Sequence, residues 1–417
     1  MGPVERLIEY HGRSRCVHSS AKTQEFSIVS ACHESYNRVA PTSRLIPRTA
    51  MNRNFGLDVL RALAIILVLL SHSRFFLVST IPQAKYLQLG GFWGVELFFV
   101  LSGLLIGRII VKEVIHEENF SLTNFWKRRW YRTIPNYSLF LFLNIVYLLT
   151  VSYSAVPIWK YFIFMQNFAW EHPLFFPESW SLAVEEMFYL MFPILVVLLM
   201  KVRFKPERAL LMSGAFILLL STTLRFLHVY FADPNWNDGV RTIVIYRLDA
   251  LMYGILLAIF LNRQRKFSRP EKNRLFAAGL TLLTASAVVF YTTNRDQDFF
   301  SRTLLFSVTS LGFALLMPAV MDLSVPRKSV VEALWRNMAL WSYSLYLSNL
   351  LIYNLIQTFW VEPAHKTKFN AILATVAYLA VSVLLSAFVY RHYELPMMKL
   401  RDSSSMARTK RWSLNRA

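Results

Sequence analysis

The sequence predicts an all-α membrane protein with about ten transmembrane helices, and three observations support this fold class. First, 55% of the 417 residues are hydrophobic and only 17% are charged, which gives a mean hydropathy of +0.37. Second, apolar stretches long enough to cross a bilayer, about 20 residues each, recur along the chain. Third, Lys and Arg are dense in alternate loops. A soluble globular enzyme and a disordered chain are both excluded, because neither is this apolar.

Taken in chain order, each predicted span is a mostly apolar run with polar or proline-containing residues on either side. Their boundaries are good to about four residues. The spans are residues 56–77, 92–111, 136–153, 180–200, 208–231, 242–261, 275–293, 303–322, 339–359 and 369–390. The segment 157–178 is aromatic but only half apolar, so we expect it to lie at the membrane interface or to re-enter the membrane.

The Lys and Arg residues predict the orientation, since cytoplasmic loops carry an excess of them. The loops that follow the even-numbered spans, 112–135, 201–207 with Arg208, 262–274 and 323–338, hold 18 of these residues, whereas the opposite loops hold 8. Both chain ends are basic as well. We therefore expect both termini to be cytoplasmic. The same bias accounts for the net charge of +20, and no nucleic-acid-binding motif is visible.

The two ends of the chain differ from the membrane body in composition. Residues 1–53 form a polar extension that we expect to be disordered, residues 54–399 form the transmembrane domain, and residues 400–417 form a basic cytoplasmic tail. The two cysteines, Cys16 and Cys32, both lie in the extension. We therefore expect no disulfide, no catalytic thiolate and no cysteine-ligated metal in the membrane body.

Charged residues inside a membrane span are costly and usually functional. The first span contains Asp58, Arg61 and His72. Arg61 and His72 are eleven residues apart, which places them on the same helix face about 16 Å apart. With the predicted orientation, His72 lies near the outer end of the span and Arg61 in its inner half.

Other ionisable residues fall into two groups by predicted depth. The first group lies near the outer surface with His72, and the second lies on the inner side. The outer group comprises Glu96, Glu185, Glu186, Arg225, Arg247 and Asp249, and the inner group comprises Arg108, Arg128, Arg129 and Arg132. A histidine with carboxylates can deprotonate a hydroxyl, and a basic patch can hold a phosphate-rich molecule. Buried ion pairs that join helices remain the alternative for each carboxylate.

Four segments carry a family resemblance. They are LDVLRALAIILVLLSH (57–72), GVELFFVLSGLLIGR (94–108), FWKRRWYRTIP (125–135) and SWSLAVEEMFYLMFP (179–193). Their content and order resemble the acyltransferase 3 family of bacterial integral-membrane O-acyltransferases. The resemblance extends over about residues 54–399, with weaker matches at 246–258, 342–349 and 393–396.

The resemblance implies a reaction and a set of site residues. An acyl group, commonly acetyl, would leave cytosolic acyl-CoA for a hydroxyl of a sugar or glycan, at or across the bacterial inner membrane. The acceptor could be lipid-linked. The catalytic positions map onto His72, Arg61 and Glu185, and the donor-binding basic segment maps onto Arg128, Arg129 and Arg132. We expect His72 to be the general base, aided by Glu185, with acyl-CoA as co-substrate and no metal.

Two points qualify this reading. The family often has an aromatic-histidine pair in the ninth span where this chain has Ser348 and Asn349, and Asn cannot accept a proton at neutral pH. We also expect no second, esterase-like domain after residue 400. The alternative function class is a transporter of an acylated lipid or saccharide, since charges near the middle of the membrane suit transporters too.

Overall fold

The computed structural model describes residues 53–116, 120–151, 156–263, 267–325, 329–361 and 367–400. These ranges are mainly helical and contain no strand, which confirms the all-α prediction. The predicted extension (1–53) and basic tail (400–417) lie outside the described residues apart from Arg53 and Leu400. The division of the chain into these parts therefore stays a prediction.

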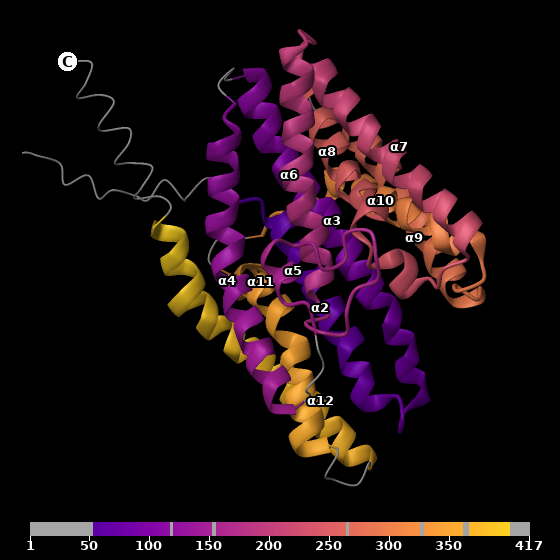
Figure 1. Ribbon diagram of the computed structural model, residues 1–417, viewed down its shortest axis with the longest axis vertical. Helices are drawn as coiled ribbons and strands as arrows, with labels where there is room; N and C mark the ends of the chain where they lie inside the picture. The colour runs from indigo at the N-terminus through magenta and orange to yellow at the C-terminus, as the bar shows by residue number, and fades with distance from the viewer. Residues whose placement is uncertain are drawn as a thin grey trace, which may run out of the picture. The chain divides into compact units, whose positions relative to one another are not determined.

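Ten long helices of the described residues overlap the ten predicted spans, although the third and the ninth begin well before the predicted boundaries, at Leu122 and Val330 rather than at 136 and 339 (Figure 1). They are α2 (Phe55–Leu77), α3 (Gln88–Val111), α4 (Leu122–Val151), α6 (Ser179–Lys201), α7 (Pro206–Ala232), α8 (Leu248–Arg263), α9 (Arg269–Thr292), α10 (Phe299–Val320), α11 (Val330–Ile356) and α12 (Lys368–Val389). Shorter helical turns connect or extend them: η1 (Pro82–Leu87), η2 (Lys112–His116), α5 (Trp159–Phe162), η3 (Asn237–Arg241), η4 (Val244–Tyr246), η5 (Gln357–Val361) and η6 (Tyr390–Glu394).

Eight of the described helices are long and apolar enough to cross a membrane, fewer than the ten predicted. α8 has 16 residues and rises only about 24 Å, which is less than the hydrocarbon core of about 30 Å. α11 has 27 residues but mixes apolar side chains with buried polar ones such as Ser344 and Asn349. α8 is short, and α11 carries polar side chains on its buried face. Both features suit helices that pack against other helices as well as or instead of lipid.

The prediction that residues 112–135 form a loop is wrong. The turn η2 continues α3 to His116, and α4 already begins at Leu122, so the basic segment is helical. Side chains three or four residues apart share one helix face, and on this segment that face carries the buried Phe125 together with the half-buried Arg129 and Arg132. The helical form thus directs two arginines inward, where a loop would have left them in solvent.

Glycines allow the central helices to approach closely. A Cβ atom on Gly103 of α3 would collide with the backbone carbonyl of Leu251 in α8, and one on Gly254 would collide with the carbonyl of Val100. Small residues at these positions let α3 and α8 pack closely. Gly90 and Gly91 lie in the first turn of α3, where the missing side chains let α3 approach α2.

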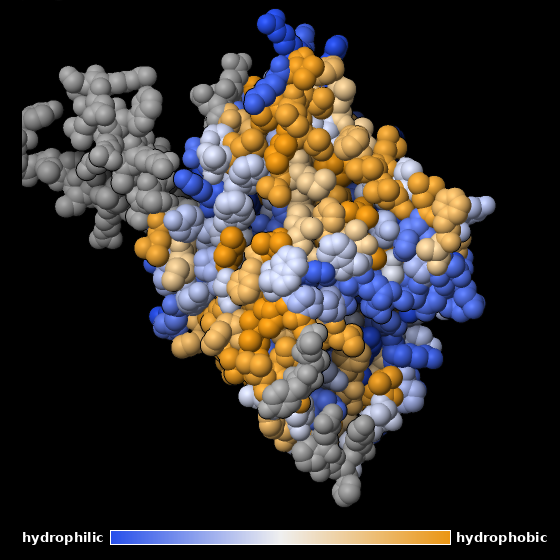
Figure 2. Space-filling view, in the orientation of Figure 1, coloured by the Kyte–Doolittle hydropathy of each residue, from blue (hydrophilic) through white to orange (hydrophobic). Residues whose placement is uncertain are grey.

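The most buried of the eight candidate spans contains α3, which packs against both α2 and α8 near the centre of Figure 1. α2 in turn contacts α11 and α12. The helices α4, α9 and α12 are the least buried and carry large exposed apolar side chains, including Phe142, Leu280 and Leu384. Figure 2 shows broad apolar areas on one face of the molecule. Such surfaces suit a multi-pass protein whose outer helices contact lipid.

Candidate active site

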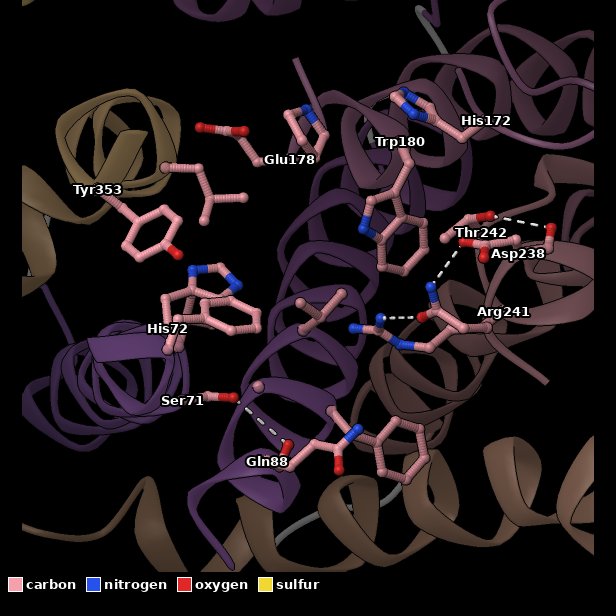
Figure 3. A pocket seen from close by; sticks show the side chains of 18 of the residues that line it. Ser71, His72, Gln88, His172, Glu178, Trp180, Asp238, Arg241, Thr242 and Tyr353 are labelled. Carbon is pink, nitrogen blue, oxygen red and sulfur yellow. Dashed lines mark hydrogen bonds between the residues drawn. The ribbon is translucent and has the colours of Figure 1, made fainter. Parts of the chain in front are cut away.

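A cavity of about 570 Å³ lies beside His72. Its walls come from α2, α3 and α11, from the segment 172–180, and from the turn η3. In Figure 3, His72 and Glu178 face this space from one side, and Trp180 and Arg241 face it from the other. We call this space the His72 cavity. Its volume is within the range of small-molecule sites, about 300–1,000 Å³.

Asn349 of α11 determines how the His72 ring is oriented. The Asn349 side-chain nitrogen donates to the backbone carbonyls of Leu345, at 3.2 Å, and Tyr346, at 2.7 Å. The amide oxygen must therefore be the atom that faces His72, and it lies 2.5 Å from Nδ1. An amide oxygen can only accept, so Nδ1 carries the proton and Nε2 keeps its lone pair. This is the tautomer that a general base requires.

A buried carboxyl group shares the His72 cavity. Neither carboxyl oxygen of Glu178 has a hydrogen-bond partner among the described residues. Burial raises the pKa of Glu178 to about 8, so this group is mostly protonated and uncharged at pH 7. His172 also lines this cavity, and its Nε2 atom lies 3.1 Å from the Ser179 hydroxyl oxygen. Burial lowers the pKa of His172 to about 4. Both groups are therefore largely neutral at physiological pH.

A second, smaller cavity of about 100 Å³ is lined by two of the three arginines predicted to bind the donor. Arg61 of α2 lines it together with Arg129 and Arg132 of α4. We call it the arginine cavity. Glu185 lies in the same wall, where its carboxylate accepts from the Ser102 hydroxyl at 2.8 Å and the Tyr189 hydroxyl at 3.1 Å.

The structure therefore divides the predicted site residues between two places. His72 lies in one cavity, and Arg61, Glu185, Arg129 and Arg132 line the other. The expected pairing of Glu185 with His72 is not found, because Glu185 of α6 lies in the arginine cavity with Arg61, in the N-terminal half of α2, and Arg129 of α4. Arg128 lines neither cavity. It points to the surface and pairs with Glu113 at 3.0 Å, with 63% of its side chain exposed.

One layer of side chains separates the two cavities. Val95 of α3 and Tyr346 of α11 line both of them. The Tyr346 hydroxyl lies 2.7 Å from the Ser181 hydroxyl of α6, and its ring meets Phe98 edge-on at 6.1 Å between centroids. Val95 and Tyr346 thus form the wall that the His72 cavity and the arginine cavity share.

Four of the other residues predicted to lie near the outer surface form buried ion pairs instead of facing His72. Arg225 of α7 makes two hydrogen bonds to the Asp249 carboxylate, at 3.0 and 2.8 Å. Arg247 pairs with Glu96, whose second oxygen accepts from Ser310 at 2.8 Å. Neither pair is among the residues that line the His72 cavity. For these four residues the ion-pair alternative holds, and they join α3, α7, α8 and α10.

No group of three or more His, Cys, Asp or Glu side chains that could hold a metal ion occurs among the described residues. The chemistry that these residues can perform is proton transfer and anion binding. A family model described as an acyltransferase domain matches residues 54–391. The chain belongs to the acyltransferase 3 family. The match extends over the membrane helices that form both cavities.

Several curated proteins are similar to this chain. O-acetyltransferase OatA of Staphylococcus aureus is 25% identical over 367 residues, which is 82% of this chain and 57% of that protein. Peptidoglycan O-acetyltransferase OatA of Listeria monocytogenes is 27% identical over 370 residues, or 82% and 56% of the two chains. The chain thus spans little more than half the length of these relatives. No solved structure matches it.

Three residues at or beside the His72 cavity were missed as functional candidates in the sequence: Glu178 and Arg241 line it, and Asn349 contacts His72. Glu178 directly precedes the SWSL motif, where it resembles a loop residue. Arg241 is one of the few basic residues in the loops that are predicted to lie outside. That position is a signal that could have singled it out. Asn349 was noted only as a departure from the family pattern. Its position in the family's histidine motif was the available clue.

Proposed function

We propose that this chain transfers an acyl group from cytosolic acyl-CoA to a hydroxyl of a saccharide or glycan at or across the bacterial inner membrane. The observation that carries the proposal is the His72–Asn349 pair, which presents an unprotonated Nε2 to a cavity large enough for a sugar. The similarity to a peptidoglycan O-acetyltransferase supports a glycan acceptor and an acetyl group.

His72 would act as the general base. A sugar hydroxyl is a poor nucleophile at neutral pH, and a positioned base contributes about 10²–10⁴ in rate. The hydroxyl proton moves to Nε2 as the oxygen attacks the thioester carbonyl carbon. The C–S bond then breaks, and the departing CoA sulfur takes the proton from Nε2. Asn349 holds the ring in one tautomer throughout.

The arginine cavity would receive the donor. Arg61, Arg129 and Arg132 face it, and no described carboxylate lies within ion-pair distance of them. Guanidinium groups suit phosphate and carbonyl oxygens. A cavity of about 100 Å³ holds only part of a CoA molecule, so the remainder would lie on the cytoplasmic side. Arg128, on the surface, would contribute to donor attraction rather than to contact.

Glu185 would belong to this donor side. Ser102 and Tyr189 hold its carboxylate in the arginine cavity, where it balances part of the arginine charge. The thioester would then pass the layer formed by Val95 and Tyr346 to reach His72. Rotation of the Tyr346 ring away from Ser181 would open this path.

The test uses the full chain in lipid nanodiscs, with acetyl-CoA labelled on the acetyl group and peptidoglycan glycan fragments as acceptor. We expect an O-acetyl ester on the glycan with wild-type protein. His72→Ala should abolish ester formation while acetyl-CoA still binds, whereas Arg61→Ala should weaken acetyl-CoA binding. Near-full transfer by His72→Ala would overturn the assignment of the base. In proteoliposomes, movement of acylated saccharide into the lumen without ester formation would favour a transporter instead.

A further inference from the structure

The wall of the His72 cavity opposite His72 holds an arginine between two tryptophans. The Arg241 guanidinium carbon lies 4.9 Å from the Trp180 ring centroid and 5.6 Å from the Trp236 ring centroid. Its Nη1 donates to the Asn237 side-chain oxygen at 3.0 Å. These contacts hold the guanidinium in one orientation, and Figure 3 shows it extended into the cavity toward the His72 side.

Arg241 has no acidic partner in the described part of the chain. None of the ion pairs found among the described residues includes it, and its Nε is buried without a hydrogen-bond partner there. The adjacent Asp238 carboxylate instead accepts from the Asn237 side-chain amide at 2.7 Å. Burial lowers the pKa of Arg241 only to about 10, so it is a cation at neutral pH.

A second arginine faces the same cavity. Arg74 of α2 lies two residues after His72 and donates from Nη1 to the Ser71 carbonyl at 2.7 Å. Its guanidinium stacks on the Phe75 ring at 4.1 Å from the centroid, and no described carboxylate pairs with it. The cavity is therefore lined by two cations, each held by aromatic rings and a hydrogen bond within the protein.

The acidic groups of the cavity do not cancel this charge. Glu178 is mostly protonated at pH 7, because burial raises its pKa to about 8. Asp238 is the one remaining carboxylate among the lining residues. A fixed, unpaired arginine in a concave site favours an anion, since charge-assisted hydrogen bonds to guanidinium are among the strongest available. The aromatic walls provide apolar surface for a sugar ring.

We propose that the acceptor is an anionic saccharide whose carboxylate or phosphate group is bound by Arg241 and Arg74 while its hydroxyl faces His72. This inference rests on the proposed function and adds the chemical class of the acceptor. The anion fixes the sugar in the cavity, and the distance between the anion and the reacting hydroxyl decides which hydroxyl is acylated. A neutral saccharide lacks this anchor and binds more weakly.

The experiment compares an anionic acceptor with its carboxyl-reduced counterpart and with a second, lipid-linked anionic acceptor, using the full chain in nanodiscs. The probes are a muramic acid-containing disaccharide, the same disaccharide with its carboxyl reduced to an alcohol, and a disaccharide joined to a lipid diphosphate. Binding is measured by calorimetry without acetyl-CoA, and transfer is measured as kcat/KM. We expect the anionic probes to bind about ten-fold or more tightly than the neutral one. The better of the two anionic probes identifies carboxylate or phosphate as the preferred group.

Variants separate anion binding from other roles. Arg241→Gln should bring the anionic and neutral acceptors to similar affinity by raising KM for the anionic probe, and Arg241→Lys should restore part of the difference. Arg295→Gln is the matched control, because Arg295 also stacks on Trp236, at 5.3 Å, but does not line the cavity. It should leave the preference unchanged.

Each outcome decides the question. Equal affinity of wild-type protein for charged and reduced acceptors, with both acylated, would overturn the anion site and leave the proposed function standing. An equal loss of affinity for charged and neutral probes in Arg241→Gln would show that Arg241 only braces Trp180 and Trp236. Absence of transfer to every acceptor, with anionic probes still bound preferentially, would support the anion site and contradict the proposed function.

Discussion

The Asn349 amide oxygen lies 2.5 Å from Nδ1 of His72 and leaves the other ring nitrogen free. The two residues are 277 positions apart in the chain, and the packing of α11 against α2 brings them together. The Tyr378 hydroxyl of α12 also donates to the same amide oxygen, at 3.3 Å. The asparagine that replaces the family's frequent histidine thus cannot exchange a proton, but it can fix the tautomer of the residue that does.

Substitution of Asn349 should therefore reduce the rate of acyl transfer more than it affects binding. We expect Asn349→Leu to lower kcat about ten-fold to a hundred-fold with little change in KM for either substrate, because the wrong tautomer presents a proton to the hydroxyl. Asn349→Asp retains an acceptor oxygen and should recover part of the rate. The measurement is steady-state kinetics with labelled acetyl-CoA. An unchanged kcat in Asn349→Leu would contradict the role given to this pair.

Within the basic segment, the two arginines that line the arginine cavity, Arg129 and Arg132, should differ from Arg128, which faces outward. Arg129→Ala should weaken acetyl-CoA binding about ten-fold or more, since a charge-assisted hydrogen bond contributes about 1.5–3 kcal/mol. Arg128→Ala is the matched control, because its side chain is exposed and paired with Glu113. Binding is measured by calorimetry in nanodiscs. Equal effects of the two substitutions would show that the segment acts only through its overall charge.

The buried Glu178 should make stability depend on pH. Its pKa is about 4.5 in an unfolded chain and about 8 in the fold, so the native state binds the extra proton between these values. Its contribution to the free energy of unfolding is fully present below pH 4.5 and is lost as the pH rises through 8. Glu178→Gln removes this dependence. Between pH 6 and pH 8.5, wild-type protein should lose at least about 2 °C more in thermal midpoint than Glu178→Gln.

The matched control for this measurement is Glu171→Gln, which removes an exposed carboxylate from the same segment. Its thermal midpoint should follow the wild-type pH dependence. Tryptophan fluorescence on heating gives the midpoints at each pH. The same slope in Glu178→Gln as in wild-type protein would mean that Glu178 does not hold a proton in the fold.

The orientation predicted from Lys and Arg can be tested at the two ends of α9. Cys16 and Cys32 are first replaced by Ser, which leaves the chain without cysteine. A single cysteine at the exposed Gln297 should then react with an impermeant maleimide added outside intact cells, and one at the exposed Asn273 should react only after lysis. Labelling in the opposite sense would reverse the assignment of the two cavities to the two sides of the membrane.

Most of the fold and part of the site could be predicted from the sequence. Apolar runs of membrane length predicted the ten helices, because the need to satisfy backbone hydrogen bonds in lipid leaves few alternatives to a helix. The spacing of Arg61 and His72 predicted one shared face of α2 with the two residues too far apart to touch. These are local properties, set by residues that are close together in the chain.

Only the tertiary structure decided which polar residues meet. Glu185 and Glu96 lie at similar predicted depths, yet Glu185 turns toward Arg61 and Arg129, whereas Glu96 pairs with Arg247. Depth along a helix follows from chain position, but the direction of a side chain depends on how each helix is rotated against its neighbours. Packing of α2, α3, α6 and α11 sets that rotation through contacts between residues far apart in sequence. For that reason Glu178 and Arg241 are recognised as parts of the His72 cavity, and Asn349 as the partner of His72, only in the folded chain.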